Sequence, residues 1–116
     1  MAKVAIIGSR TFNDYNLLKK IMNEIDESET IDLIISGGAK GADSLGEQYA
    51  DEVGIEKLIF PALWEKYGRK AGPLRNTDII NNSDIVVCFW DGKSTGTLDS
   101  INKAKASKKD VHIIRF

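Results

Sequence analysis

The sequence predicts one α/β domain in which a five-stranded parallel sheet is covered by helices on both faces, a three-layer arrangement. Five short apolar segments alternate with stretches whose apolar residues recur at helical spacing. Strands and helices that alternate in this way form right-handed βαβ units, which place the strands parallel in one sheet. Several apolar segments are also nearly uninterrupted, as expected for central parallel strands. We expect the strand order 3-2-1-4-5, counted along the chain, and a single domain over residues 1–116.

Each predicted strand is a short apolar run bounded by polar or turn residues. The first follows a single lysine, and the second and fourth are almost purely apolar. The third ends at Pro61, whose missing N–H group cannot join a sheet ladder. Strands are therefore expected over residues 3–8, 32–35, 56–60, 85–90 and 111–116.

The helices are predicted from apolar residues spaced three or four apart. In the first of them, Leu18, Met22 and Ile25 recur at this spacing, with polar residues between them. The second should end before Gly54, because glycine accepts the left-handed conformation that commonly follows a helix. Helices are expected over residues 14–27, 42–53, 73–82 and 95–107. Residues 62–72 are interpreted as a long connection that could serve as a lid.

The composition indicates a soluble globular protein, since 42% of the residues are hydrophobic and 28% are charged. The longest uncharged apolar run, residues 85–90, is too short to span a bilayer, and the start of the chain predicts no signal peptide. A single cysteine excludes an internal disulfide, so a cytoplasmic location is expected. The 16 basic and 17 acidic side chains nearly cancel, which gives no broad field for duplex nucleic acid.

Three loops that follow the first, second and fourth strands combine glycine with hydroxyl groups or cations. They are residues 8–12 (Gly-Ser-Arg-Thr-Phe), 36–43 (Ser-Gly-Gly-Ala-Lys-Gly-Ala-Asp) and 91–97 (Asp-Gly-Lys-Ser-Thr-Gly-Thr). These strands are neighbours in the expected order, so the loops should meet at the carboxyl edge of the sheet, near its switch point. Backbone N–H groups, short hydroxyls and cations are what a phosphate site requires.

Several of these polar residues have a structural interpretation besides a ligand-binding one. Asp14 and Asp43 are each expected first as a helix N-cap and second as a ligand of a ribose or a metal. Ser94 or Thr95 could cap the last helix, contact an anion, or do both. Arg10 could grip a phosphate or carboxylate with two N–H groups, or stay in solvent as a surface arginine.

Residues 64–76 contain a second group of candidates. Trp64 could stack on a base or ribose, or it could fill the core beneath the connection. Arg75 and Asn76 stand at the start of the predicted third helix. A cation there opposes the helix dipole, so an anionic partner is expected for Arg75.

The sequence offers few groups for metal or triad chemistry. Its one histidine, His112, lies on the predicted last strand, and its one cysteine, Cys88, lies in a strand expected to be buried. No transition-metal site and no Ser-His-Asp set can therefore be assembled near the three loops. No resident cofactor is predicted, while Mg²⁺ carried in by a phosphate ligand stays open, with Asp43 or Asp91 as distant candidates.

Five ordered motifs carry a resemblance to a known family. They are residues 8–12 (G-S-R-x-F), 36–43 (S-G-G-A-x-G-A-D), 61–68 (P-A-x-W-x-x-Y-G), 71–76 (A-G-x-x-R-N) and 89–97 (F-W-D-G-x-S-x-G-T). Together they span nearly the whole chain and resemble the YspA-like branch of the SLOG superfamily. The resemblance implies a Rossmann-like domain that binds nucleotides or nucleotide-derived ligands, of a kind common in bacteria and phages.

The same superfamily includes the LOG-type phosphoribohydrolases and the DNA-processing protein DprA. LOG enzymes carry P-G-G-x-G-T-x-x-E after the fourth strand, and their glutamate and an upstream arginine serve N-glycosidic cleavage. Gly96-Thr97 is similar to the G-T pair, and Arg75 to the arginine. The glutamate position falls on Ser100, and Asp99 would point about 100° away on a helix. A neutral serine cannot replace the carboxylate, which argues against LOG-type hydrolysis.

The favoured hypothesis is a module that binds or senses a small ligand similar to ADP-ribose or a nucleoside monophosphate. A LOG-type hydrolase, with Arg75 and Asp99 as candidate catalytic residues, is the first alternative. Single-stranded DNA binding, implied by the relation to DprA, is the second, and the charge balance gives it little electrostatic support. No membrane partner is expected, and homo-oligomerisation stays open. The predicted ligand-binding residues are Gly8, Ser9, Arg10, Ser36, Gly37, Gly38, Ala39, Gly41, Asp43, Trp64, Arg75, Asn76, Gly92, Ser94, Thr95, Gly96 and Thr97.

Overall fold

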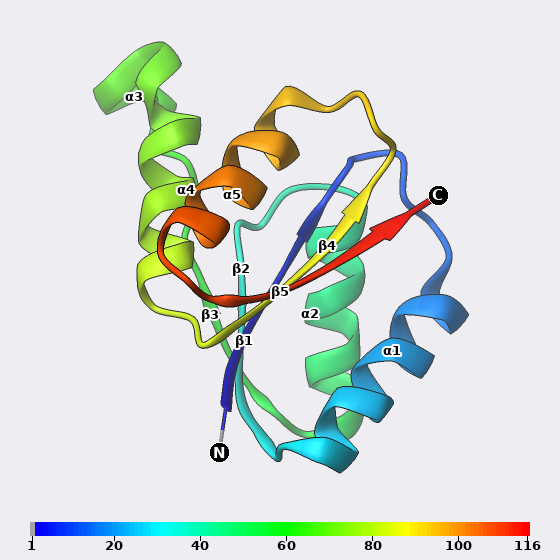
Figure 1. Cartoon of the computed structure of the whole chain (residues 1–116). Helices are drawn as coiled ribbons and strands as arrows, with labels where there is room; N and C mark the ends of the chain where they lie inside the picture. The colour runs from blue at the N-terminus through cyan, green and yellow to red at the C-terminus, as the bar shows by residue number, and fades with distance from the viewer. Residues whose placement is uncertain (1) are drawn as a thin grey trace.

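A computed structural model describes residues 2–116 and contains one five-stranded sheet (Figure 1). All neighbouring strands are parallel, in the order β3-β2-β1-β4-β5, so the predicted fold class and strand order are confirmed. The strands are β1 (Ala2–Gly8), β2 (Ile31–Ser36), β3 (Glu56–Ile59), β4 (Ile85–Trp90) and β5 (Asp110–Arg115). Each lies within two residues of its predicted bounds.

Helices cover both faces of the sheet. They are α1 (Tyr15–Ser28), α2 (Ala42–Val53), α3 (Trp64–Tyr67), α4 (Ala71–Asn81) and α5 (Thr95–Ala106), with the 3₁₀ turn η1 (Gly68–Lys70) between α3 and α4. On one face α1 and α2 pack on the sheet through buried side chains such as Leu18, Met22 and Tyr49. On the other face α4 and α5 do so through Ile79 and Ile101.

The central strands β1 and β4 are buried on both faces, which matches their uninterrupted apolar sequences. Gly8 at the end of β1 pairs with Phe89 near the end of β4, so the loops that follow the two strands begin at the same level. The helices after β1 and β4 lie on opposite faces of the sheet. This divergence leaves room for a ligand at the carboxyl ends of the two strands.

The connection between β3 and α4 differs from its prediction. Residues 64–70 are not an irregular lid but the short helix α3 and the turn η1, and α4 begins at Ala71 rather than at residue 73. Pro73 fits the first turn of α4 because that turn does not use its N–H groups. The alternative in which Trp64 fills the core is wrong, since this side chain is 54% exposed.

Two of the predicted helix caps are confirmed and one is wrong. Asp14 accepts a hydrogen bond from the Leu17 N–H group at 3.1 Å, and Ser94 accepts one from the Thr97 N–H group. Asp43 is not an N-cap, because Gly41 occupies that position of α2 with a backbone φ of 79°. Asp43 is the second residue of the helix, and its carboxylate turns to the preceding loop instead.

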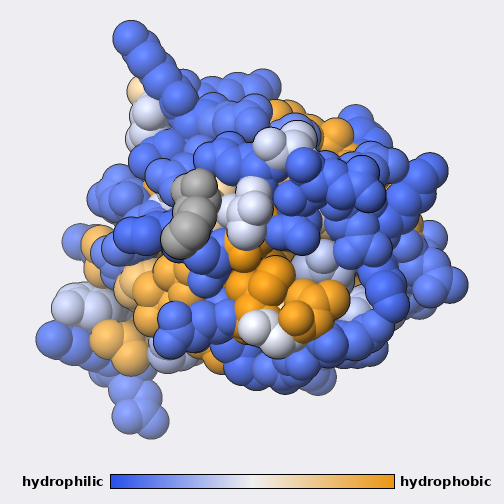
Figure 2. Space-filling view, turned by 90° about the horizontal axis from the view of Figure 1, so that it is seen from below, coloured by the Kyte–Doolittle hydropathy of each residue, from blue (hydrophilic) through white to orange (hydrophobic). Residues whose placement is uncertain are grey.

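The amino-terminal ends of the strands lie at the other end of the sheet, away from the carboxyl ends where the three loops meet. Figure 2 shows this end from below, with hydrophilic residues over most of it and hydrophobic residues in separate patches, one below the centre and one at the left. Within residues 2–116, every helix falls short of the length and apolar character that a membrane span requires.

Candidate functional site

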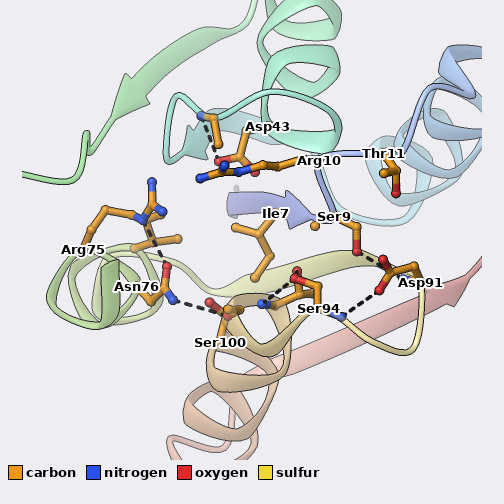
Figure 3. Close-up of a pocket in the computed structure, with 15 residues that line it drawn as sticks. Ile7, Ser9, Arg10, Thr11, Asp43, Arg75, Asn76, Asp91, Ser94 and Ser100 are labelled. Atoms are coloured by element: carbon orange, nitrogen blue, oxygen red, sulfur yellow. Dashed lines mark hydrogen bonds between the residues drawn. The ribbon is translucent and has the colours of Figure 1, made fainter. Parts of the chain in front are cut away.

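A cavity of about 280 Å³ lies at the carboxyl edge of the sheet, where β1 and β4 end (Figure 3). Its walls come from the loops after β1, β2 and β4 and from helices α4 and α5. The lining residues are Ile7, Gly8, Ser9, Arg10, Thr11, Ala39, Asp43, Arg75, Asn76, Ile79, Asp91, Ser94, Gly96, Thr97 and Ser100. The three loops predicted to meet therefore do meet, at the predicted edge.

Ten of the predicted ligand-binding residues line this cavity. They are Gly8, Ser9, Arg10, Ala39, Asp43, Arg75, Asn76, Ser94, Gly96 and Thr97. Of the others, Ser36, Gly37, Gly38, Gly92 and Thr95 belong to the same loops but do not line it, and Gly41 lines a neighbouring shallow pocket that shares Arg10. Trp64 lies outside both pockets.

Five lining residues are absent from the predicted ligand-binding residues. Thr11 and Asp91 lie in two of the three loops predicted to form the site, and Asp91 is predicted only as a distant Mg²⁺ candidate. Ile79 and Ser100 lie three or four residues beyond Asn76, Arg75 and Thr97 on the same helices, and helical periodicity could have identified them. Ile7 is a core residue of β1 whose side chain forms the apolar floor.

The loops after β1 and β4 are held together by their backbones. The Ser9 N–H group donates to the Phe89 carbonyl at 2.9 Å, and the Asp91 N–H group donates to Ser9 Oγ at 3.2 Å. A Cβ atom on Gly8 would collide with the Phe89 carbonyl, so this close approach requires glycine. Ser9 is therefore a buried link between the two central loops.

The glycine loop after β2 is organised by Asp43. One oxygen of its carboxylate, Oδ2, accepts hydrogen bonds from the N–H groups of Gly37 at 3.0 Å and Ala39 at 3.4 Å. On the other side, Arg75 Nη1 donates to the Gly37 carbonyl at 2.8 Å. A Cβ atom on Gly37 would collide with the Arg75 guanidinium and lie 2.8 Å from Asp43 Oδ2, so any larger residue here has to displace these side-chain ends.

Burial raises the pKa of Asp43 to about 6, from the 3.8 that is usual for an aspartate side chain. The hydrogen bonds from Ala39 and Gly37 and the positive charge of Arg75 act in the opposite direction, and burial outweighs them. None of the ion pairs formed within residues 2–116 involves Asp43. The carboxylate is thus a buried charge held by backbone N–H groups and a nearby cation.

The start of α5 presents hydrogen-bond donors to the cavity. Asp91 Oδ1 accepts from the N–H groups of Lys93 and Ser94, both at 2.8 Å, and these bonds hold the pKa of Asp91 below its usual range. Beyond this turn the N–H groups of Thr95 and Gly96 have no acceptor in the described part of the chain. Unpaired donors at a helix start are a favourable place for an anion.

Helix α4 contributes Arg75 and Asn76, which form a chain of hydrogen bonds. Arg75 Nε donates to Asn76 Oδ1 at 3.0 Å, and Asn76 Nδ2 donates to the Gly96 carbonyl and to Asp99 Oδ2. Arg75 is the fifth residue of α4 and not the third, as predicted, so it lies beyond the first turn and the expected conflict with the helix dipole does not arise. Its observed partner is the Gly37 carbonyl, with the Asp43 charge nearby.

Ser100 and Asp99 point in different directions, as the helical spacing predicts. Ser100 is 3% exposed and lines the cavity, whereas Asp99 lies outside the lining and pairs with Lys103 at 2.8 Å. The position that resembles the LOG glutamate therefore presents a hydroxyl group. The carboxylates that do line the cavity are Asp43 and Asp91.

Neither carboxylate belongs to a metal-binding cluster of side chains. Among residues 2–116, no group of three or more His, Cys, Asp or Glu side chains is arranged to hold a metal ion. Asp43 Oδ2 and Asp91 Oδ1 each already accept two N–H groups. A Mg²⁺ ion at this edge would depend on a phosphate ligand for most of its oxygen ligands.

Comparison with known proteins identifies the family. Residues 2–67, more than half of the chain, match the family described as YspA, cpYpsA-related SLOG. The chain belongs to this SLOG family. It is also similar to the Gene 61 protein of Mycobacterium phage D29, with 29% identity over 123 aligned positions that cover all of this chain and 97% of that protein.

The SLOG domain also has the fold of DNA processing protein A. It superposes on the crystal structure of this protein from Streptococcus pneumoniae with a TM-score of 0.80 at 20% identity, covering 98% of this chain and 50% of that one. For the Helicobacter pylori protein, studied for its single-stranded DNA binding mode, the TM-score is 0.67 at 22% identity, with 96% and 64% covered. The SLOG domain thus spans about half to two thirds of these proteins.

Proposed function

We propose that this SLOG domain binds a nucleotide or nucleotide-derived ligand, such as a nucleoside monophosphate or ADP-ribose, in the cavity where β1 and β4 end. The proposal rests on one observation: three kinds of protein group that bind phosphate surround a single cavity. These are the free N–H groups at the start of α5, the hydroxyls of Ser94 and Thr97, and the guanidinium groups of Arg10 and Arg75. Backbone N–H groups at a helix start are fixed donors, and the hydroxyl and guanidinium groups add further hydrogen bonds and positive charge.

The phosphate fits best at the α5 side of the cavity. The helix dipole adds to the free N–H group of Gly96 there, and Arg10 lines the same cavity. Within residues 2–116 only the Nε and Nη1 atoms of Arg75 have acceptors, so Nη2 remains a donor for a ligand. Arg10 and Arg75 line the same cavity, and two cations can balance the charge of a phosphate dianion.

The cavity volume favours a mononucleotide or one half of a larger ligand. Small-molecule sites commonly measure about 300–1,000 Å³, and this cavity, at about 280 Å³, lies near the lower end of that range. The shallow pocket beside it, lined by Asn13, Gly41 and Ser44, shares Arg10 and could extend the site for an ADP-ribose-like molecule.

Thermal unfolding with a nucleotide panel tests the proposal. AMP, the other nucleoside monophosphates and ADP-ribose, at micromolar to millimolar concentration, should raise the Tm of the wild-type chain. Arg10→Ala and Arg75→Ala should each weaken the shift, whereas Arg69→Ala should not, because the exposed Arg69 lies in η1 away from the cavity. If no nucleotide moves the Tm at millimolar concentration, the proposal is wrong.

Hydrolysis of the ligand is the weaker alternative, because Ser100 supplies no carboxylate at the position that matters in the LOG pattern. Chromatographic detection of free adenine after incubation with AMP would support hydrolysis.

Single-stranded DNA binding is a second candidate, supported by the fold shared with DNA processing protein A. A gel shift with oligothymidine at low salt tests it, and binding that weakens steeply with salt would support it.

A further inference from the structure

Asp43 is a buried carboxylate with one occupied and one free oxygen. The residue is 5% exposed, and both of its hydrogen bonds, from Gly37 and Ala39, end on Oδ2. No donor in residues 2–116 reaches Oδ1, yet Oδ1 is not among the buried polar atoms that lack a partner. It therefore keeps access to the space that Asp43 lines, which is the cavity.

The two ends of the cavity differ in chemistry. Figure 3 shows Asp43 on one side of Ile7, and Ser94 and Ser100 on the other. The α5 side offers N–H and hydroxyl donors, which suit a phosphate, whereas an ionised carboxylate repels one. Oδ1 can instead accept a hydrogen bond from a neutral donor, and the donors that lie close to the phosphate of a nucleotide are the ribose hydroxyls.

We propose that Asp43 Oδ1 accepts a hydrogen bond from a ribose hydroxyl of the bound nucleotide and thereby selects ribonucleotides over deoxyribonucleotides. The inference rests on the proposed function and narrows its ligand class. A ligand that lacks the hydroxyl leaves the buried carboxylate without its partner, and such an unmatched group is strongly disfavoured. The positive charge of Arg75, which lies beside Asp43, lowers the pKa of this carboxyl group against the effect of burial and so favours the ionised, accepting form.

A purely structural role for Asp43 makes a different prediction. In that case the carboxylate only holds the loop after β2 through Gly37 and Ala39, and its loss weakens all nucleotides equally. In Asp43→Asn the amide oxygen can still accept from both N–H groups, while the amide nitrogen replaces Oδ1 and donates instead of accepting. This variant therefore keeps the loop and changes the group that meets the sugar.

The test is calorimetric titration of wild type, Asp43→Asn and the control Asp32→Asn with AMP, 2′-deoxy-AMP and 3′-deoxy-AMP. Asp32 is exposed near the start of β2 and lies outside the cavity lining, so its variant removes the same charge far from the cavity. In wild type and in Asp32→Asn, at least one deoxy analogue should bind about tenfold or more weakly than AMP, the effect of one hydrogen bond to a charged group. In Asp43→Asn the ratio should fall towards one, with the affinity for that analogue kept or raised.

The outcomes separate the two proposals. If wild type binds AMP and both deoxy analogues equally, ribose selection by Asp43 is wrong and nucleotide binding stands. Equal loss of all three nucleotides in Asp43→Asn, with the wild-type ratio kept, makes Asp43 a structural residue and also overturns the inference. No binding of any nucleotide overturns the proposed function, and this inference with it. If Asp43→Asn does not fold, the inference is tested by the affinity ratios of the deoxy analogues to AMP in the wild type and in the variant Asp43→Ser.

Discussion

Asp43 and Arg75 form hydrogen bonds with opposite sides of the same residue, Gly37. The Asp43 carboxylate accepts from the Gly37 N–H group at 3.0 Å, and the Arg75 guanidinium donates to the Gly37 carbonyl at 2.8 Å. One side chain comes from α2 and the other from α4, which lie on opposite faces of the sheet. The glycine loop is therefore the point where the two helical layers are connected beside the cavity.

Gly37→Ala should disrupt this connection. The added methyl group would collide with the Arg75 guanidinium and lie 2.8 Å from Asp43 Oδ2, so both side chains must move. We expect a loss of about 1–3 kcal/mol in the free energy of unfolding, as for other overpacked sites, together with weaker nucleotide binding. Urea unfolding and titration with AMP measure the two effects.

Gly96→Ala is the matched control for stability. A Cβ atom at Gly96 meets nothing within 4 Å, and the residue lies in the first turn of α5. The same chemical change should therefore leave stability unaltered or raise it by about 0.5–1 kcal/mol through helix propensity. Equal stability of the two variants would contradict the proposed crowding around Gly37.

The stability of the protein should fall as pH rises through the range in which Asp43 titrates. Its pKa is raised from 3.8 in an unperturbed side chain to about 6 in the fold, so the folded state binds the proton more tightly. This contribution is fully present below pH 3.8 and is lost as pH rises through about 6. A shift of this size corresponds to about 3 kcal/mol.

Asp43→Asn removes this titration while keeping an acceptor for the glycine loop. The difference in unfolding free energy between the variant and wild type should therefore grow in favour of the variant by about 2 kcal/mol between pH 4.5 and 7.5. Urea unfolding at several pH values measures it. Asp99→Asn, which changes a partly exposed carboxylate, is the control. If the difference in unfolding free energy between Asp43→Asn and wild type stays constant with pH, burial does not raise the pKa of Asp43.

The sheet and the meeting of its loops could be predicted because they follow from patterns that extend along the whole chain. Alternating apolar runs and helical spacing determine the strand order, and the strand order brings the three loops to one edge. The helix caps at Asp14 and Ser94 were predictable because an N-cap is a local interaction over three residues. Such features need no knowledge of distant contacts.

The parts that could not be predicted depend on contacts between distant residues or on very short elements. Helix α3 and turn η1 together span seven residues, too few for a helical period to be recognised. Asp43 has the residue type and position of a cap, but Gly41 takes that place, and the carboxylate folds back to Gly37 and Ala39. The sequence pattern contains no signal that distinguishes these two outcomes.

The turn at Asp91 should control the anion-binding capacity of α5. In Asp91→Ala the N–H groups of Lys93 and Ser94 lose their acceptor, so the start of the helix becomes less ordered. In Asp91→Asn the acceptor remains and a negative charge near the phosphate disappears. We expect Asp91→Asn to bind AMP at least as tightly as wild type and Asp91→Ala to bind several-fold more weakly than Asp91→Asn, measured by calorimetry. Equal affinities of the two variants would contradict a role for this turn.

Trp90 should report ligand binding, whereas Trp64 should not take part in it. The Trp90 indole N–H group donates to the Ser94 carbonyl at 3.0 Å, directly at the start of α5. Trp64 is 54% exposed and lies outside the cavity, so its predicted stacking on a base finds no support in its position. In Trp64→Phe the remaining tryptophan is Trp90, and its emission should change on addition of AMP with a Kd equal to that of wild type. A Kd about tenfold higher in this variant would instead show that Trp64 contributes to binding, because the loss of a stacked aromatic side chain costs about 1–3 kcal/mol of binding free energy.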